Sequence, residues 1–316
     1  MVRHVFLDQN QWIYLSKDYR GHPHRQEHNG IAQQFLKMVQ SDRIRLPLNT
    51  IHFNETLLAE DAGSRQRLAE IFDIFSQGWY TASWSTILPI EIRRAIAKTF
   101  GHLQGPLPRV FGKGFLFGRS APEQTLLRDN RSDEKLWLLE QISAQPGAIV
   151  DLVTFPNESG RKKQNQYIYE SGETNALAAE RLRQARRGCS VAMQRRAQYA
   201  GYTIHHQDIL IRELATIGKT MTDLLALELD KMICFWNDVP SLYVDSELTM
   251  YRDRQWSRKI KENDVRDFGH MALALPYCDL VVTEKFLAHA AVATGIDKKF
   301  GTVVCSDLAE ALESLN

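Results

Sequence analysis

The chain has 316 residues, of which 44% are hydrophobic, and a formal net charge of +1. This length is sufficient for one large domain or two of ordinary size, and the composition can build a substantial core. No apolar run is long enough to span a bilayer, and the N-terminal segment MVRHVFLDQN resembles a charged strand rather than a signal peptide. We therefore expect a cytoplasmic protein that has no membrane partner.

The first hundred residues alternate between strand and helix patterns. A short β-rich run ends at Asp8, and apolar residues at helical spacing follow it directly. A second helix over residues 31 to 43 leads into a strand over residues 44 to 49. Asn49 or Thr50 then caps a helix that contains Glu55. This alternation predicts an α/β fold with a parallel sheet and crossover helices.

The middle of the chain has a different pattern. Residues 101 to 118 are rich in Gly and Pro, which indicates a loop or a boundary, and residues 123 to 256 are mostly helical. One stretch contains no acid and six arginines, namely Arg181, Arg183, Arg186, Arg187, Arg195 and Arg196. Such a charge run is commonly a solvated helix face. The alternative is a surface that contacts the phosphates of a nucleic acid.

The C-terminal segment returns to the α/β pattern. It contains an amphipathic helix over residues 263 to 276, a buried strand over residues 278 to 284, another helix, and a last strand over residues 300 to 306. We therefore predict one discontinuous α/β domain, formed by residues 1–100 and 257–316, and a mostly helical insertion over residues 101–256.

Acidic residues occur at the ends of these strands and the starts of these helices. Each one alone is more commonly a turn or cap residue. Carboxylates that converge on one edge of a sheet, however, would repel one another unless a cation neutralised them. Oxygen ligands favour Mg²⁺ or Mn²⁺, so the pattern predicts a site for a divalent cation. The candidate metal ligands are Asp8, Glu55, Asp264, Asp267 and Glu284.

The arrangement resembles the PIN domain family of nucleases. The resemblance rests on LDQNQW at residues 7 to 12, on Glu55, and on DFGHMALALPYCDLVVTEKF at residues 267 to 286. In that family an aspartate ends the first strand, a glutamate lies in a following helix, an aspartate begins a late helix, and an acid or polar residue ends the next strand. The matching residues in this chain are Asp8, Glu55, Asp267 and Glu284, with Thr283 matching a threonine often found beside the last acid.

Several assignments remain open within this pattern. Asp264 and Asp267 share one face of the late helix; the spacing to the strand end favours Asp267 as the ligand, and Asp264 is either the helix N-cap or the ligand itself. Asn10 either caps the first helix or orients Asp8 or a scissile phosphate. His52 shares a helix face with Glu55, as a partner of the ligands or as a structural histidine. The long insertion departs from the compact family pattern.

The resemblance implies an endonuclease that depends on Mg²⁺ or Mn²⁺ and hydrolyses phosphodiester bonds, with RNA favoured over DNA. Asp8, Glu55 and Asp267 would be the main ligands, and Glu284 would complete the shell or activate the water. Many relatives are toxins or antiphage effectors that cut tRNA or rRNA, so an antitoxin or defence-system partner protein and a homo-oligomer are also expected. The alternatives are a DNA-cleaving defence nuclease and a non-catalytic PIN-like module that binds nucleic acid or protein.

Overall fold

The computed structural model describes residues 2–119, 141–154 and 158–316, and the chain divides into two compact units. The first unit comprises residues 1–83, 110–172 and 277–316, and the second comprises residues 84–109 and 173–276. This division differs from the predicted boundaries, because residues 84–100 and 257–276 belong to the second unit.

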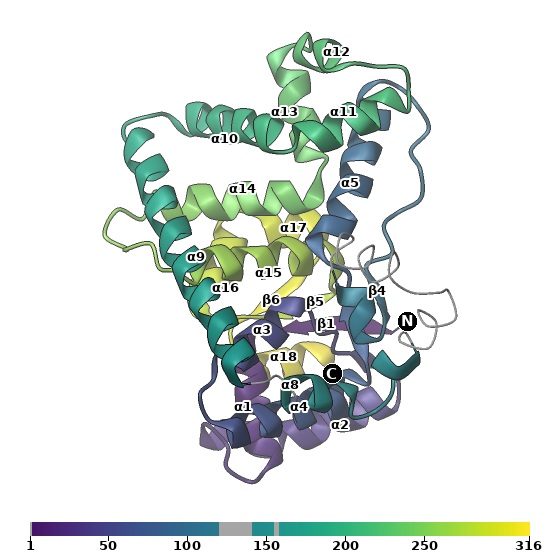
Figure 1. Ribbon diagram of the computed structural model, residues 1–316, viewed down its shortest axis with the longest axis vertical. Helices are drawn as coiled ribbons and strands as arrows, with labels where there is room; N and C mark the ends of the chain where they lie inside the picture. Colours follow the sequence, from purple (N-terminus) through teal and green to yellow (C-terminus); the bar gives the residue numbers. More distant parts are fainter. Residues whose placement is uncertain (1, 120–140, 155–157) are drawn as a thin grey trace. The chain divides into compact units, whose positions relative to one another are not determined.

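The first unit contains a four-stranded parallel sheet. Its strands are β1 (Arg3–Leu7), β2 (Ile44–Arg45), β5 (Leu280–Val282) and β6 (Val303–Cys305), in the order β2-β1-β5-β6. All three pairings are parallel, and Leu7 of β1 lies opposite Val282 of β5. Two N-terminal and two C-terminal strands thus form one sheet, which confirms the predicted α/β class (Figure 1).

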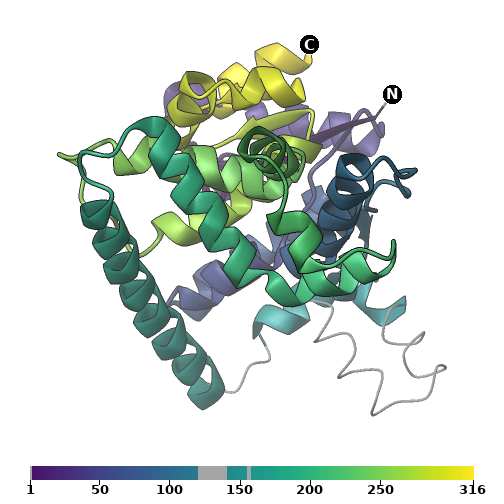
Figure 2. The ribbon, with the colours of Figure 1, turned by 90° about the horizontal axis from the view of Figure 1, so that it is seen from above.

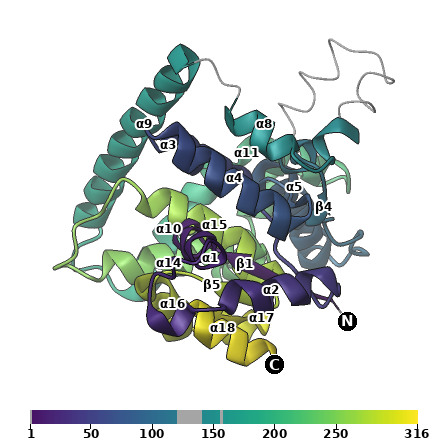
Figure 3. The ribbon, with the colours of Figure 1, turned by 90° about the horizontal axis from the view of Figure 1, so that it is seen from below.

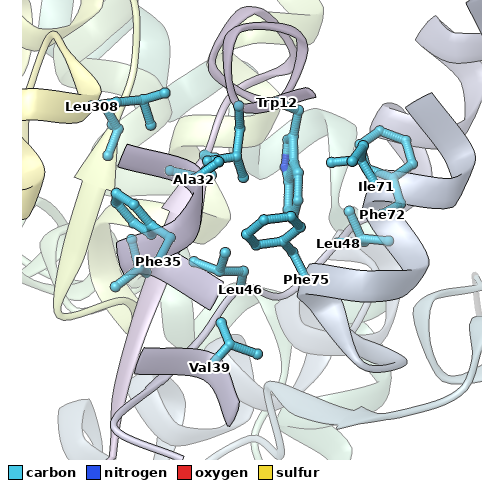
Figure 4. Close-up of a cluster of buried hydrophobic side chains, with 14 of the residues drawn as sticks. Trp12, Ala32, Phe35, Val39, Leu46, Leu48, Ile71, Phe72, Phe75 and Leu308 are labelled. Carbon is cyan, nitrogen blue, oxygen red and sulfur yellow. The ribbon is translucent and has the colours of Figure 1, made fainter. Parts of the chain in front are cut away.

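Helices pack around this sheet through an apolar core. Those of the first unit are α1 (Gln9–Tyr19), α2 (Ile31–Gln40), α3 (Thr50–Leu58), α4 (Ala62–Ser76), α8 (Ala148–Thr154), α16 (Lys285–Ala293), α17 (Ile296–Phe300) and α18 (Leu308–Leu315). Helices α1 and α2 contact each other, and both contact α4 (Figure 3). Trp12, Phe35 and Phe72 are completely buried between these helices and the sheet (Figure 4).

Part of the predicted Gly- and Pro-rich loop is a strand, so that prediction was wrong for these residues. Strand β4 (Phe111–Lys113) pairs antiparallel with β3 (Trp79–Thr81), outside the parallel sheet. Glycine fits position 112 of this strand pair, because a Cβ atom there would lie 2.5 Å from the ring of Phe117. A glycine at such a close approach hides the strand from a propensity argument.

The second unit is helical in its described residues. It contains α5 (Trp84–Thr99), α10 (Val191–His205), α11 (Gln207–Ala215), α12 (Met221–Leu225), α13 (Leu229–Asn237), α14 (Pro240–Asp253), nearly all of α15 (Asp264–Tyr277) and the C-terminal part of α9 (Glu158–Ala185). Its core includes Phe235, Trp236 and Ile92, all fully buried. Figure 2 shows α9 (dark teal, at the left) as one long helix that leads into α10. No helix among the described residues combines the length and apolar character needed to cross a membrane.

Candidate active site

Asp8 and Glu284 follow the two central strands of the parallel sheet. Asp8 comes directly after β1, and its backbone N–H donates to the carbonyl oxygen of Val282 at 3.0 Å. Glu284 lies two residues after β5 ends, on the neighbouring strand. The chain runs from β1 outwards to β2 on one side and from β5 outwards to β6 on the other. In open parallel sheets, ligands bind at the carboxyl edge where the strand order reverses in this way.

Asp8 is itself the N-cap of α1. Its Oδ1 atom accepts a hydrogen bond of 3.0 Å from the backbone N–H of Gln11. The possibility that Asn10 caps this helix was therefore wrong: Asn10 is the second residue of α1 and is exposed to solvent. The aspartate is the cap because the cap position precedes the first helical residue, Gln9.

The environment of Asp8 disfavours its charged form. Burial raises the pKa of the Asp8 carboxyl to about 6, and the negative charge of Glu284 acts in the same direction. The charged form of Asp8 is favoured by hydrogen bonds from the amides of Gln11 and Glu284 and by the nearby hydroxyl of Thr283. These contacts do not offset the effect of burial on the pKa. Among the described residues, no arginine, lysine or histidine pairs with Asp8. The acid is thus held close to a second acid without a compensating cation.

Thr283 connects the two acids. It is completely buried, and its hydroxyl is near enough to Asp8 to favour the carboxylate form. The same hydroxyl forms no hydrogen bond of normal geometry with the described residues.

His52 holds the helix of Glu55 against the end of β1. The His52 Nε2 atom lies 2.8 Å from the carbonyl oxygen of Leu7, and its Nδ1 atom lies 3.1 Å from the backbone nitrogen of Asn49. Burial lowers the pKa of His52 to about 4, so the ring is neutral, Nε2 donates and Nδ1 accepts. This completes a capping box in which Asn49 is the N-cap of α3, one of the two predicted caps.

A second contact joins the same two segments. The Gln9 side-chain amide donates to the Thr56 hydroxyl at 3.1 Å. Gln9 follows Asp8 and Thr56 follows Glu55, so the helix that carries the partly exposed Glu55 is fastened to the Asp8 segment at two points. The first unit therefore brings Asp8, Thr283 and Glu284 together, and ties the helix of Glu55 to this sheet edge.

Asp264 and Asp267 belong to the second unit and differ from each other. Asp264 is 2% exposed, and both of its carboxylate oxygens accept bonds of 2.7 Å from the guanidinium of Arg258. The Lys261 amide donates a further bond of 3.0 Å to Asp264. Asp267 lies one turn later in α15 and is partly exposed. Both carboxylate oxygens of Asp264 are thus already bonded to Arg258.

Three of the six arginines in the basic stretch are tied to acids. Arg195 lies 2.6 Å from Glu247 of α14, Arg186 lies 4.0 Å from Asp253 of the same helix, and Arg183 pairs with Glu180. The remaining three, Arg181, Arg187 and Arg196, are exposed. The absence of acids in the stretch was misleading, because α14 supplies two of the partners and the preceding turn of α9 supplies the third.

One cluster was not found from the sequence. Glu27, His28 and Asp307 have potential ligand atoms within 4.8 Å of one another, and the buried His28 Nε2 atom lies 2.9 Å from Asp307. Arg25 lies 3.1 Å from Glu27, and Asp307 also caps α18. An arginine and a helix N-terminus already compensate these acids, so the cluster is an ion network. Only the pairing of residues far apart in sequence reveals it.

Comparison with known proteins adds no family assignment. No protein-family model matches the chain, and no significant similarity was found to curated proteins or to solved structures.

Proposed function

We propose that the chain is a metal-dependent endonuclease with a PIN-like arrangement of strands and acids. The observation that supports this most is the pair formed by Asp8 and Glu284, after the two central parallel strands, with the pKa of Asp8 raised to about 6. Holding two acids together without a cation costs folding free energy. Such a cost is common at functional sites and uncommon elsewhere.

The side chains at this sheet edge fit a hard divalent cation. Carboxylate and hydroxyl oxygens are the donors that Mg²⁺ and Mn²⁺ select. Asp8, Glu284 and Glu55 would hold the ion directly or through water. Asp267, on α15 in the second unit, is the further acid that the resemblance to PIN nucleases assigns. The hydroxyl of Thr283, which favours the carboxylate form of Asp8, would help to orient that ligand.

A bound divalent cation lowers the pKa of a coordinated water and stabilises the charge that develops on a phosphate. The chain's own residues position the acids: Thr283 and the amides of Gln11 and Glu284 orient the Asp8 carboxyl, and His52 fixes α3. A neutral histidine in that place adds no charge to the site. Its role is to hold the acids in place, and we assign it no proton transfer.

RNA is the favoured substrate, and tRNA or rRNA the favoured targets, because of the resemblance to PIN nucleases. The same resemblance supports a toxin or antiphage role, with an antitoxin or defence-system protein as partner and the chain acting as a homo-oligomer. Cleavage of DNA in a defence system is the alternative substrate assignment.

One observation favours a non-catalytic module. Asp8 and Glu284 occupy the N-cap positions of α1 and α16, and the Asp8 side chain makes a cap hydrogen bond, so capping would explain the acid at position 8. Capping does not explain the acid at position 284, whose side chain makes no cap hydrogen bond, nor why the charge of Glu284 acts on Asp8. We therefore rank this assignment second.

The test is cleavage by the purified chain of total RNA, plasmid DNA and single-stranded DNA, each with Mn²⁺ and with EDTA. We expect RNA cleavage with Mn²⁺ and none with EDTA, and none by Asp8→Asn prepared in parallel. Calorimetric titration with Mn²⁺ separates the two assignments. Absence of both binding and cleavage would support the non-catalytic module.

A further inference from the structure

A second basic segment lies against the C-terminal part of α9. Residues 252 to 261, RDRQWSRKIK, join α14 to α15 and contain five cations and one acid. The Arg183 guanidinium of α9 donates to the carbonyl oxygen of Arg258 at 2.8 Å. The guanidinium carbons of Arg183 and Arg187 lie 5.5 and 5.4 Å from the centre of the Trp256 ring. Two basic segments far apart in sequence thus meet around one tryptophan.

The surface is concave where these two segments contact each other. A cavity of about 870 Å³, open to solvent, lies between α9 and the segment, and its lining includes Glu173, Leu177, Trp256, Lys259 and Lys261. Trp256 is 43% exposed, although an indole of this size is normally buried. An exposed aromatic face in an open concave site can stack a base that is not already paired.

The charges around the cavity favour a polyanion. Arg183 and Arg258 are neutralised by Glu180 and Asp264. On the cavity lining itself, the exposed cations Lys259 and Lys261 are balanced by the exposed acids Glu173 and Glu262. Two further exposed cations lie outside the lining, Arg187 beside the Trp256 ring and Arg254 two residues before Trp256. The excess of cations is therefore beside Trp256, the one large aromatic side chain that the described residues place on the lining.

We propose that this cavity binds a segment of single-stranded RNA, with a base stacked on Trp256 and neighbouring phosphates held by Lys259, Lys261 and Arg187. This inference rests on the proposed nuclease function, for which it names the substrate-binding surface. Single strands are favoured over duplexes because stacking on a side chain requires an unpaired base. The segment leads directly into α15, the helix that carries Asp267.

The test is equilibrium binding of a fluorescein-labelled, mixed-sequence single-stranded RNA in EDTA, measured by fluorescence anisotropy at several salt concentrations. Trp256→Leu should weaken binding roughly five- to hundredfold, whereas Trp256→Phe, which can still stack, should bind nearly as wild type. The double variant Lys259→Gln/Lys261→Gln should reduce the slope of log K against log salt by about 0.7 for each phosphate that the protein no longer neutralises.

A matched control removes the same charge elsewhere in the second unit. Lys219→Gln/Lys231→Gln should leave the affinity and the salt slope close to wild type. Equal effects of the two double variants would overturn the proposal, because net charge and no defined site would then explain binding. Wild-type affinity in Trp256→Leu, or no RNA binding by the wild type, would also overturn it. Duplex RNA of the same sequence should bind more weakly and be insensitive to Trp256; a duplex preference would count against the site.

Cleavage with Mn²⁺ is measured separately, so failure of the two proposals can be told apart. If the wild-type chain binds RNA through Trp256 but cleaves nothing, the RNA-binding site is supported and the nuclease function is contradicted. If the wild-type chain cleaves RNA but the Trp256→Leu variant binds RNA normally, the nuclease function is supported and the RNA-binding site is contradicted. Circular dichroism and the Tm of each variant verify folding, and the double variant Lys259→Gln/Lys261→Gln keeps the test available if Trp256→Leu does not fold.

Discussion

The Nε2 atom of His52 donates a hydrogen bond of 2.8 Å to the main-chain carbonyl oxygen of Leu7. Leu7 is the last residue of β1, and Asp8 follows it; His52 is on α3, one turn before Glu55. The buried side chain of His52 therefore links the end of β1, which is followed by Asp8, to α3, which carries Glu55. Because the ring is neutral and completely buried, the strength of this link depends on pH.

We expect His52→Gln to lower the free energy of unfolding by about 2–4 kcal/mol at pH 7, because it disturbs two buried hydrogen bonds and leaves a packing defect. The folded pKa of about 4 lies below the ordinary value of 6.5. The stability contributed by the neutral ring is therefore present above pH 6.5 and is lost as the pH falls towards 4, by about 3 kcal/mol. Urea denaturation from pH 4.5 to 8 should show the difference between the variant and wild type shrinking at acidic pH. A difference that does not change with pH would exclude this role.

Asp8→Asn should abolish cleavage while it stabilises the metal-free protein. Asn keeps an N-cap acceptor for α1 and removes the repulsion by Glu284. The folded pKa of Asp8, about 6, is above its ordinary value of 3.8, so stability is greatest below pH 3.8 and falls as the pH rises through 6. The gain in free energy of unfolding from Asn should therefore reach up to about 3 kcal/mol above pH 6 and disappear near pH 4.

Thermal denaturation in EDTA measures this gain in stability, and Mn²⁺ should raise the Tm of wild type more than that of the Asp8→Asn variant. Wild-type cleavage by a folded Asp8→Asn chain would remove Asp8 from the site.

Of the two acids of α15, Asp267→Asn should lose cleavage with little change in Tm. Asp264→Asn should instead lower the free energy of unfolding by roughly 1–3 kcal/mol, because it leaves the guanidinium of Arg258 without its carboxylate. Single-turnover cleavage at saturating Mn²⁺ and the Tm of both variants are the measurements. Loss of cleavage in Asp264→Asn at unchanged Tm, with an active Asp267→Asn, would assign the ligand to Asp264.

Five of the six arginines of residues 181–196 should separate into two groups. Arg181→Gln, Arg187→Gln and Arg196→Gln together should weaken RNA binding and flatten its salt dependence by about 0.7 for each phosphate left without its arginine, with an unchanged Tm. Arg195→Gln should lower the Tm instead, because it leaves Glu247 of α14 without this arginine; Arg186→Gln should lower it less, because Asp253 keeps Arg252. Anisotropy in EDTA and thermal denaturation test both statements. Equal loss of RNA binding in both groups would instead indicate that the whole stretch forms one phosphate-contacting surface.

Local pattern was enough to predict most of the elements that carry the acids. A short apolar run, followed by apolar residues at helical spacing, predicts that Asp8 stands at the end of a strand. Pro, Gly and Asn residues predict where the helices and strands around Glu55 and Glu284 begin or end. It failed where a tertiary requirement overrode propensity, as at Gly112, where the ring of Phe117 leaves no room for a side chain. It also missed the cap of α1, because an aspartate after a strand fits a ligand and a cap equally well.

The sequence by itself determined the α/β class, the union of the chain's two ends in one parallel sheet, and which acids stand at strand ends, because these depend on apolar periodicity along the chain. Only the tertiary structure decided which charges are already compensated. Asp264 is held by Arg258, three of the arginines are held by acids, and His52 binds Leu7, whereas no cation among the described residues pairs with Asp8. Charge compensation depends on distances of a few ångströms, and for pairs far apart in sequence, such as Arg195 and Glu247, these distances exist only once the core has packed.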